Sequence, residues 1–184
     1  MPMVPDWLQW SDVFLSLIAF GLAVVTLPTA FQMWWGKPHL TITFRREGVE
    51  AGAVLFLSVS NKPVKNKLLR SIGVRRDAAQ NVGAIAEIRE SGTNRFIGRK
   101  TLELSVNRGE RSFRVNIFPK SPALAFLIRH KHGEENAEFS DGKIELPQGE
   151  YMCELNIIWR EEKIVQRRTF AVGGSINNTR WRAQ

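Results

Sequence analysis

The chain has 184 residues, enough for one domain of ordinary size and an appendage. Its single cysteine, Cys153, excludes an internal disulfide and therefore a small fold held together by disulfides. Charge is uneven: residues 1–36 contain two Asp and no basic residue, whereas residues 37–184 contain 26 basic against 16 acidic residues, a net charge of +10. The two parts of the chain therefore differ in character.

Residues 13–35 form an uncharged, mostly apolar segment of 23 residues. At ~1.5 Å per residue, a helix of this length is about 34 Å long and crosses the ~30 Å hydrocarbon layer of a bilayer. Asp6 with Gln9 resembles a capping box at its start, and Gly36 and Pro38 close its end. Tryptophans flank both ends, as in the interfacial belts of membrane helices: Trp7, Trp10, Trp34 and Trp35. We therefore predict a transmembrane helix.

Pro28 is the one irregular residue of this segment. It removes the helical hydrogen bond to the carbonyl of Val24 and predicts a kink. Membrane helices tolerate such a proline because neighbouring hydroxyls, here Thr26 and Thr29, can satisfy the released group. We therefore count Pro28 as part of the membrane anchor.

Small residues line one face of the same segment, namely Ser16, Ala19 and Ala23. The pair of alanines four residues apart lets two helix backbones approach closely. This face predicts a homo-oligomer or another membrane-helix partner, although small residues also occur on faces that contact only lipid.

A buried core helix and a cleaved signal peptide are alternatives to a membrane span, and both fit the segment less well. A core helix seldom remains uncharged for so long, and a signal peptide has a basic start and a shorter apolar run, although residues 27–30, "LPTA", loosely resemble a cleavage site. Lys37, Arg45 and Arg46 follow the segment, and the positive-inside rule places that side in the cytoplasm. We therefore predict residues 1–12 outside the cell (inner) membrane, 13–35 across it and 36–184 in the cytoplasm.

The remainder of the chain has the pattern of a mainly β protein. Short apolar or alternating segments recur at intervals of about 8–12 residues, and no convincing amphipathic helix separates them. The expected strands are 40–44, 54–60, 70–77, 82–90, 101–106, 112–118, 123–130, 151–159 and 163–172, with a long polar loop at 131–142. This spacing predicts an antiparallel β-sandwich or barrel.

A short segment favours the sandwich. In "LPQGEYMCEL", Tyr151 lies two residues before Cys153 at the start of a late strand. This arrangement resembles the tyrosine corner of immunoglobulin-like sandwiches, although the second cysteine and the central tryptophan of that family are missing. The resemblance implies that the Tyr151 hydroxyl bonds to a nearby main-chain group. It carries no functional implication, because such sandwiches have many functions.

Candidate chemistry is sparse. His130, His132, Glu134 and Glu135 are close in sequence, but a closed zinc site needs four ligands and a solvated hairpin end explains them better. Cys153 shares a strand face with Tyr151 and is expected to be a buried thiol rather than a nucleophile. We therefore predict no enzyme, no metal site and no cofactor.

The basic residues are the stronger functional signal. Candidate contacts to an anionic partner are Lys62, Lys65, Lys67, Arg70, Arg75, Arg76, Arg167 and Arg168. They fit an anionic inner leaflet or a protein partner, and less well a nucleic acid, because aromatic residues are not interleaved with them. The main hypothesis is an anchored β-sandwich that acts as an interaction or scaffold module in a membrane complex. The alternative is a membrane-anchored sensor that binds a nucleotide or nucleic acid.

Overall fold

The computed structural model describes residues 6–49, 52–106, 110–139, 144–160 and 162–182, apart from the side chains of 6–10, 12, 49 and 176. The chain forms two compact units. The first unit combines residues 1–38 with residues 63–77, and the second combines residues 39–62 with residues 78–184. The predicted division into 1–12, 13–35 and 36–184 did not anticipate that residues 63–77 join the helix.

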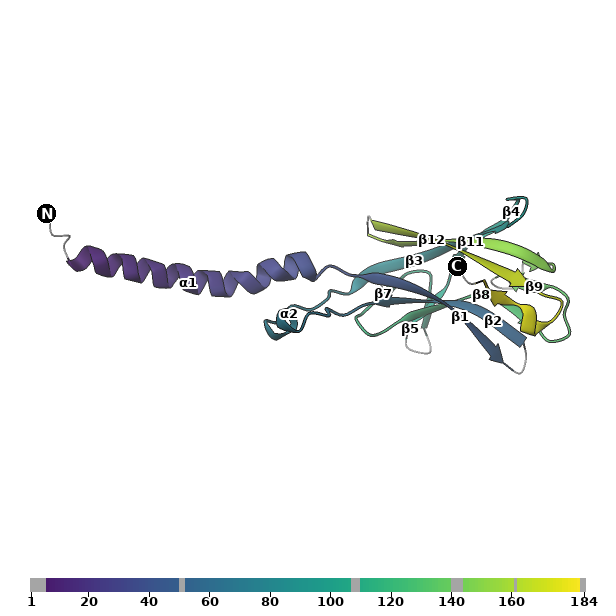
Figure 1. Ribbon diagram of the computed structural model, residues 1–184, viewed down its shortest axis with the longest axis horizontal. Helices are drawn as coiled ribbons and strands as arrows, with labels where there is room; N and C mark the ends of the chain where they lie inside the picture. Colours follow the sequence, from purple (N-terminus) through teal and green to yellow (C-terminus); the bar gives the residue numbers. More distant parts are fainter. Residues whose placement is uncertain (1–5, 50–51, 107–109, 140–143, 161, 183–184) are drawn as a thin grey trace. The chain divides into compact units, whose positions relative to one another are not determined.

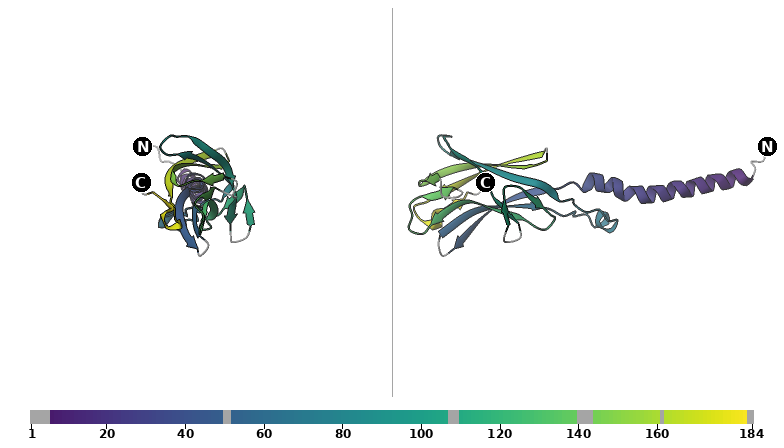
Figure 2. Two further views of the ribbon diagram at one scale, coloured as in Figure 1. Left: turned by 90° about the vertical axis from the view of Figure 1, so that its right-hand side faces the viewer. Right: turned by 180° about the vertical axis from the view of Figure 1, so that it is seen from behind.

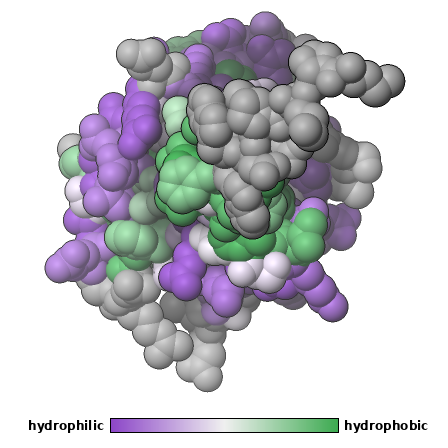
Figure 3. Space-filling model, turned by 90° about the vertical axis from the view of Figure 1, so that its left-hand side faces the viewer, coloured by the Kyte–Doolittle hydropathy of each residue, from purple (hydrophilic) through white to green (hydrophobic). Residues whose placement is uncertain are grey.

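The first unit is built on α1, Asp6–Trp35, which is drawn from purple to blue in Figure 1. The segment Val13–Trp35 is long and apolar enough to cross a membrane, and its side chains are exposed except for the half-buried Pro28, Phe31 and Gln32. Figure 3 shows exposed hydrophobic surface in green on the side from which the helix is seen end-on. The helix continues through Pro28, and the Thr26 hydroxyl donates to the Leu22 carbonyl oxygen at 2.8 Å rather than to the carbonyl of Val24.

The second unit consists of two antiparallel sheets that face each other in a sandwich-like arrangement (Figures 1 and 2). Within the described residues, one sheet has the order β1-β2-β8-β5-β6, with β9 added to β8 and β10 to β9. Its strands are β1 Leu40–Val49, β2 Gly52–Asn61, β5 Leu104–Val106, β6 Glu110–Ser112, β8 Ala123–Lys131, β9 Ala137–Phe139 and β10 Ile144–Leu146. We call it sheet A.

The other sheet, sheet C, has the order β13-β12-β11-β3-β4, with β7 added to β3. Its strands are β3 Ala79–Glu90, β4 Phe96–Leu102, β7 Val115–Ile117, β11 Gly149–Trp159, β12 Glu162–Val172 and β13 Arg180–Trp181. A short 3₁₀ turn, η1 Ile176–Asn178, precedes β13. The longest pairing of sheet C is the β11–β12 hairpin, which runs from Gly149 opposite Val172 to Trp159 opposite Glu162.

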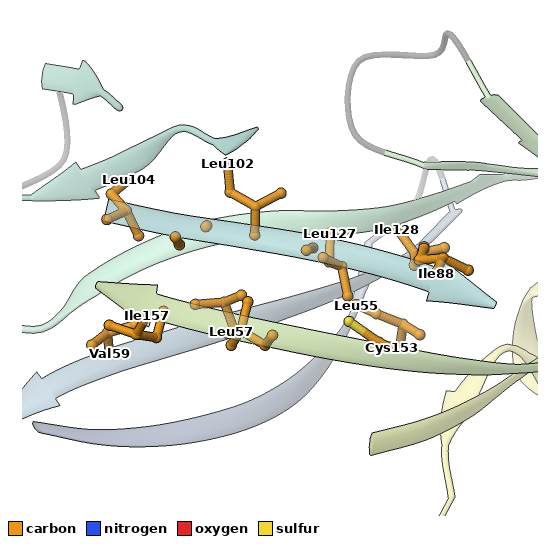
Figure 4. Packing of buried hydrophobic residues seen from close by; sticks show 14 of the residues in the cluster. Leu55, Leu57, Val59, Ile88, Leu102, Leu104, Leu127, Ile128, Cys153 and Ile157 are labelled. Carbon is orange, nitrogen blue, oxygen red and sulfur yellow. The ribbon is translucent and has the colours of Figure 1, made fainter. Parts of the chain in front are cut away.

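One core fills the space between the sheets (Figure 4). It receives the inward-facing residues of both sheets because successive side chains of a strand alternate between its two faces. Leu55, Leu57 and Val59 of β2 lie opposite Ile88 of β3 and the buried face of β11. Each of these core positions is fully excluded from solvent. This shared core confirms a mainly β fold with two antiparallel sheets.

Three expected strands differ from the sequence prediction. Residues 101–106 were expected to form one strand, but β4 ends at Leu102 in sheet C and β5 begins at Leu104 in sheet A. Both leucines are fully buried and Glu103 between them is exposed, so the chain passes from one sheet to the other at the edge of the core. In the same way, the expected strand 112–118 is divided between β6 and β7, and Phe113 at the division is 52% exposed rather than core-facing.

The third difference concerns residues 70–77, where the prediction of a strand was wrong. This segment begins at the end of α2, Lys67–Ser71, and continues as a loop. Val74 of this segment packs within the first unit instead of joining a sheet. Conversely, the loop expected at 131–142 contains β9, and residues 140–143 lie outside the described part of the chain.

Candidate functional site

The end of α1 is held by residues 63–77, which we call the basic loop. Gln32 provides the main contact, because its amide group bonds to both main-chain groups of Arg75. The Arg75 N–H donates to Gln32 Oε1 at 3.0 Å, and Gln32 Nε2 donates to the Arg75 carbonyl oxygen at 2.8 Å and to Asp77 Oδ1 at 2.9 Å. These three hydrogen bonds attach the loop to the C-terminal turn of the helix.

Main-chain groups just beyond the helix complete this attachment. The Asp77 N–H donates to the Gly36 carbonyl oxygen at 2.7 Å, and Arg76 Nη1 donates to the Lys37 carbonyl oxygen at 2.6 Å. The last carbonyls of a helix need such partners, because the helix itself provides none. A Cβ at Gly36 would lie 2.3 Å from the Gln32 carbonyl oxygen, so the close approach requires glycine.

A small apolar cluster supports the basic loop. Val64, Leu69 and Val74 are buried and pack with the half-buried Phe31 of α1. Leu69 belongs to α2, whose first turn is capped by the Asn66 side chain, which accepts from the Leu68 N–H at 2.9 Å. The loop is therefore a folded element with its own inner side.

The other side of α2 presents apolar and basic side chains to the exterior. Leu68 is 70% exposed and Ile72 is 36% exposed. The basic loop also carries Lys65, Lys67, Arg70, Arg75 and Arg76, with Asp77 as its only acidic residue. Among the described residues, the side chains of Lys65, Lys67 and Arg70 are exposed and form no ion pair. The loop thus combines a net charge of +4 with exposed apolar surface.

The three other predicted anionic contacts do not belong to the basic loop. Lys62 belongs to the sandwich unit, and Arg167 and Arg168, as neighbours on β12, point to opposite faces of sheet C. Arg167 Nε donates to Glu154 Oε2 at 2.8 Å, and this hydrogen bond lowers the pKa of Glu154. Arg168 lies opposite the buried Cys153 across the strand pair. The eight predicted residues are therefore not one cluster.

An aromatic patch on the outer face of sheet A is a second candidate site. Phe56 of β2 lies opposite Phe126 of β8, with ring centroids 6.5 Å apart. Leu124 lies two residues before Phe126 on the same face, and these two side chains are 39% and 45% exposed. The Arg111 guanidinium of β6 lies over the Phe126 ring, 5.6 Å from its centroid.

This aromatic patch, Phe56, Leu124 and Phe126 with Arg111, was not predicted from the sequence. A signal for it exists in both strands. Phe56 stands between Leu55 and Leu57, and Phe126 between Ala125 and Leu127, at positions where alternation directs a side chain outward. Large apolar residues at outward positions of two neighbouring strands mark an exposed patch, but their pairing must be known first.

The histidines do not form a metal site. His130 is fully buried, with Nδ1 2.7 Å from Thr179 Oγ1 and Nε2 2.8 Å from the Glu134 carbonyl oxygen, so both ring nitrogens have partners within the protein. His132 is exposed. In the part of the chain that the structure describes, no group of three or more His, Cys, Asp or Glu side chains could hold a metal ion. His130 instead helps to hold Thr179, which precedes β13.

Cys153 and Tyr151 both lie on the inner face of β11. Burial raises the pKa of the Cys153 thiol to about 12, so the thiol is protonated at neutral pH and is a poor nucleophile. Tyr151 stacks on Phe170 and donates from its hydroxyl to the Pro147 carbonyl oxygen at 2.8 Å. This is the bond that the tyrosine-corner resemblance implies, and burial raises the pKa of the Tyr151 hydroxyl.

The predicted membrane-anchor residues are placed only in part. Trp34 is 77% exposed and Trp35 is 41% exposed at the end of α1. The side chains of Trp7 and Trp10, and the predicted capping pair Asp6 and Gln9, lie outside the described side chains. Ser16, Ala19 and Ala23 are exposed along the helix, and their role in helix pairing stays a prediction.

Comparison with known proteins adds no assignment, because no protein-family model matches the chain and no curated protein matches its sequence. The basic loop and the aromatic patch are therefore the features from which a function can be inferred.

Proposed function

We propose that this protein is a single-pass membrane protein whose sandwich binds another subunit of a membrane complex on the cytoplasmic face of the cell membrane. The aromatic patch on sheet A carries this proposal. The proposed role is that of an interaction module, without catalysis and without a cofactor.

The anchor part of the proposal is supported by α1. Its apolar segment Val13–Trp35 has 23 residues. Exposing these apolar side chains to water costs free energy, whereas exposing them to lipid is favourable. The exposed Trp34 and Trp35 at its end suit the level of the lipid headgroups. Gln32, the polar residue near this end, has its hydrogen-bonding groups satisfied by the basic loop, as a position near the hydrocarbon region requires.

The basic loop also supports the orientation. The positive-inside rule depends on basic residues close to the ends of a membrane span. Lys37 follows α1 directly, and the hydrogen bonds of Gln32 and Gly36 bring five further basic residues to the same end from residues 65–76. The N-terminal end has Asp6 and Asp12 but no Lys or Arg. This asymmetry favours a cytoplasmic sandwich.

The chemistry of the patch indicates the kind of partner. Contiguous exposed apolar surface is uncommon on soluble domains unless it takes part in binding, and aromatic residues and Arg are enriched at protein interfaces. Phe56, Phe126 and Leu124 are flanked by Arg45 on β1 and by Arg111 on β6. We therefore propose a partner that presents an apolar centre with an acidic rim.

The alternative function, an anion sensor, would require several Arg side chains directed into one cavity. A cleft of about 660 Å³ in the sandwich unit is lined in part by Glu110, Arg114, Asn116 and Phe118. Among the described residues its lining includes one Arg, and Arg114 Nη1 already donates to the Asn81 carbonyl oxygen at 3.2 Å. The observations in the described residues therefore favour the interaction module.

Photo-crosslinking in the native membrane tests the patch. A photoreactive amino acid at Phe126 is expected to give one discrete protein adduct. The same group at Val165, which is 48% exposed on the outer face of sheet C, serves as a matched control and is expected to give none. Arg111→Glu is expected to reduce the Phe126 adduct at least ~tenfold, because interface Arg residues often dominate binding. Equal labelling from both positions, or no adduct from Phe126, would contradict the proposal.

A reporter that is active only outside the cytoplasm, fused to Gln184, tests the orientation. We expect no reporter signal, whereas a cytoplasmic reporter at the same position is active. The opposite result would place the sandwich outside and would favour an external assembly or adhesion subunit. The size and location of the protein provide a further check. We expect the full-length chain in the membrane fraction, whereas cleavage after residue 30 would give a shorter chain released from the bilayer.

A further inference from the structure

We propose that the basic loop is a binding site for anionic lipid headgroups, in which α2 lies in the membrane interface and inserts Leu68 and Ile72. This inference rests on the proposed membrane anchor and identifies the residues that contact the bilayer surface beside it.

The position of the basic loop is the first support for this site. The loop and α1 belong to one compact unit, joined by the hydrogen bonds of Gln32, Gly36 and Arg76 and by the cluster around Phe31. If α1 crosses a bilayer, its last turn, with Trp34 and Trp35, lies at the interface. The attached loop must then lie close to the headgroups as well.

The two sides of α2 differ in a way that suits an interface. Leu69 points into the small cluster and is buried, whereas Leu68 and Ile72 are exposed. Neither side chain belongs to the small cluster, and Leu68, 70% exposed, is the more open of the two. Apolar side chains of an interfacial helix enter the boundary between headgroups and acyl chains, while basic side chains beside them remain among the phosphates.

The charge of the basic loop favours an anionic surface. The loop has five basic residues and one acidic residue in 15 positions. Lys65, Lys67 and Arg70 flank or belong to α2, on the same short segment as Leu68. Each basic residue close to an anionic leaflet strengthens binding by roughly fivefold, so three of them together change it by about two orders of magnitude. Nucleic acid is a weaker candidate, because the loop contains no aromatic residue on which a base could stack.

Depth-dependent fluorescence quenching of the full-length protein in lipid nanodiscs tests the site. Ile72→Cys carries an environment-sensitive fluorophore, and nitroxide-labelled lipids act as quenchers. Cys153 is buried and its thiol pKa is raised to about 12, so the unsubstituted protein should remain unlabelled and provides the background. A fluorophore at Val165→Cys on the sandwich is the control position.

In nanodiscs with 30% phosphatidylglycerol, chosen as an anionic surface, we expect strong quenching at position 72 and little at position 165. Pure phosphatidylcholine or the triple variant K65E/K67E/R70E should reduce quenching at position 72 at least ~threefold. A matched triple variant of exposed sandwich residues, K120E/R160E/K163E, changes the net charge by the same amount. It should leave the quenching at position 72 unchanged. Leu68→Ser preserves the charges and should reduce the insertion of the same fluorophore.

The possible failures are distinguishable. A full-length protein that does not incorporate into nanodiscs contradicts the membrane anchor itself. A protein that incorporates but leaves position 72 unquenched in both lipid compositions overturns the lipid site and leaves the anchor intact. Equal quenching with and without phosphatidylglycerol contradicts the role of the basic residues. Protection of position 72 by added oligonucleotide, without quenching by lipid, would replace the lipid site by a nucleic-acid site.

Discussion

The two units of this protein use their charged residues differently. The sandwich unit contains 20 basic and 15 acidic residues, a net charge of +5 over 131 residues. Several of these form ion pairs on its surface, such as Arg167 with Glu154 and Lys131 with Glu138. The basic loop has nearly the same net charge, +4, in only 15 residues. The excess charge of the chain is therefore concentrated beside the end of α1.

The units also differ in what stabilises them. The sandwich buries a large core between two sheets, whereas the described part of the first unit buries three side chains, Val64, Leu69 and Val74, against Phe31. Between Val13 and Trp35, the apolar side chains of α1 are exposed except for the half-buried Pro28 and Phe31. A core of this size contributes little compared with the entropy lost on ordering a chain segment. We infer that the sandwich is stabilised by its own interior and the first unit by its surroundings.

The largest expected effect concerns the core of the sandwich. Leu57→Ala should lower the free energy of unfolding by about 2–5 kcal/mol, because it leaves a cavity in a fully buried site. Leu68→Ala in the basic loop is the matched control and should change it by less than about 0.5 kcal/mol, because Leu68 is exposed. Urea unfolding of the full chain in detergent, followed by the circular dichroism of the β-sheets, measures both. Equal losses would contradict the comparison of the two units.

Tyr151→Phe should cost the sandwich about 1–3 kcal/mol. The substitution preserves the ring that stacks on Phe170 but removes the hydroxyl that donates to the Pro147 carbonyl oxygen. The same urea titration measures this loss. A change below ~0.5 kcal/mol would show that the hydrogen bond is unimportant and would weaken the resemblance to a tyrosine corner.

Gln32→Leu should release the basic loop without unfolding the sandwich. The variant loses three hydrogen bonds to Arg75 and Asp77, each contributing about 0.5–1.5 kcal/mol. We expect the amide hydrogens of Arg75 and Asp77 to exchange at least ~tenfold faster, which corresponds to about 1.4 kcal/mol. Met33→Leu, at an exposed neighbouring position, is the control. Unchanged exchange in Gln32→Leu would mean that the apolar cluster alone holds the loop.

The smallest expected effect is a dependence on pH. The hydrogen bond from Arg167 lowers the pKa of Glu154 below its usual value of 4.5. A carboxylate with a lowered folded-state pKa contributes stability above pH 4.5, and this contribution is lost as the pH falls through the folded-state value. Because the pair is exposed, we expect only about 0.2–1 kcal/mol. Glu154→Gln should reduce the loss of unfolding free energy at acidic pH, as measured by urea titrations at a series of pH values. The same loss in the variant and the unsubstituted protein would contradict a contribution from the Arg167–Glu154 pair.

Several features follow from local sequence. The 23 uncharged residues of Val13–Trp35 predict the long exposed helix, since its length and composition are properties of a single segment. The alternation in Leu40, Ile42 and Phe44 likewise predicts a strand with one face toward the core, as found in β1. The position of Tyr151 before a buried Cys153 indicates the inner face of β11.

Other features depend on pairing that local sequence does not specify. The alternation of Leu102 and Leu104 is the same for one continuous strand and for two strands on opposite sheets, so only the fold reveals the crossing. The aromatic patch exists because Phe56 and Phe126, 70 positions apart in the chain, are neighbours in sheet A. Arg167 and Arg168 are adjacent in sequence yet point to opposite faces.

The sequence by itself determined the apolar helix, the β character of the rest of the chain and the excess of basic residues, because composition and periodicity are local. The tertiary structure decided where that charge lies. Gln32 and Arg75 are 43 positions apart, and nothing in either neighbourhood specifies that they meet. Their hydrogen bonds bring the basic loop to the end of α1, since a buried or membrane-adjacent amide must find partners wherever the folded chain supplies them.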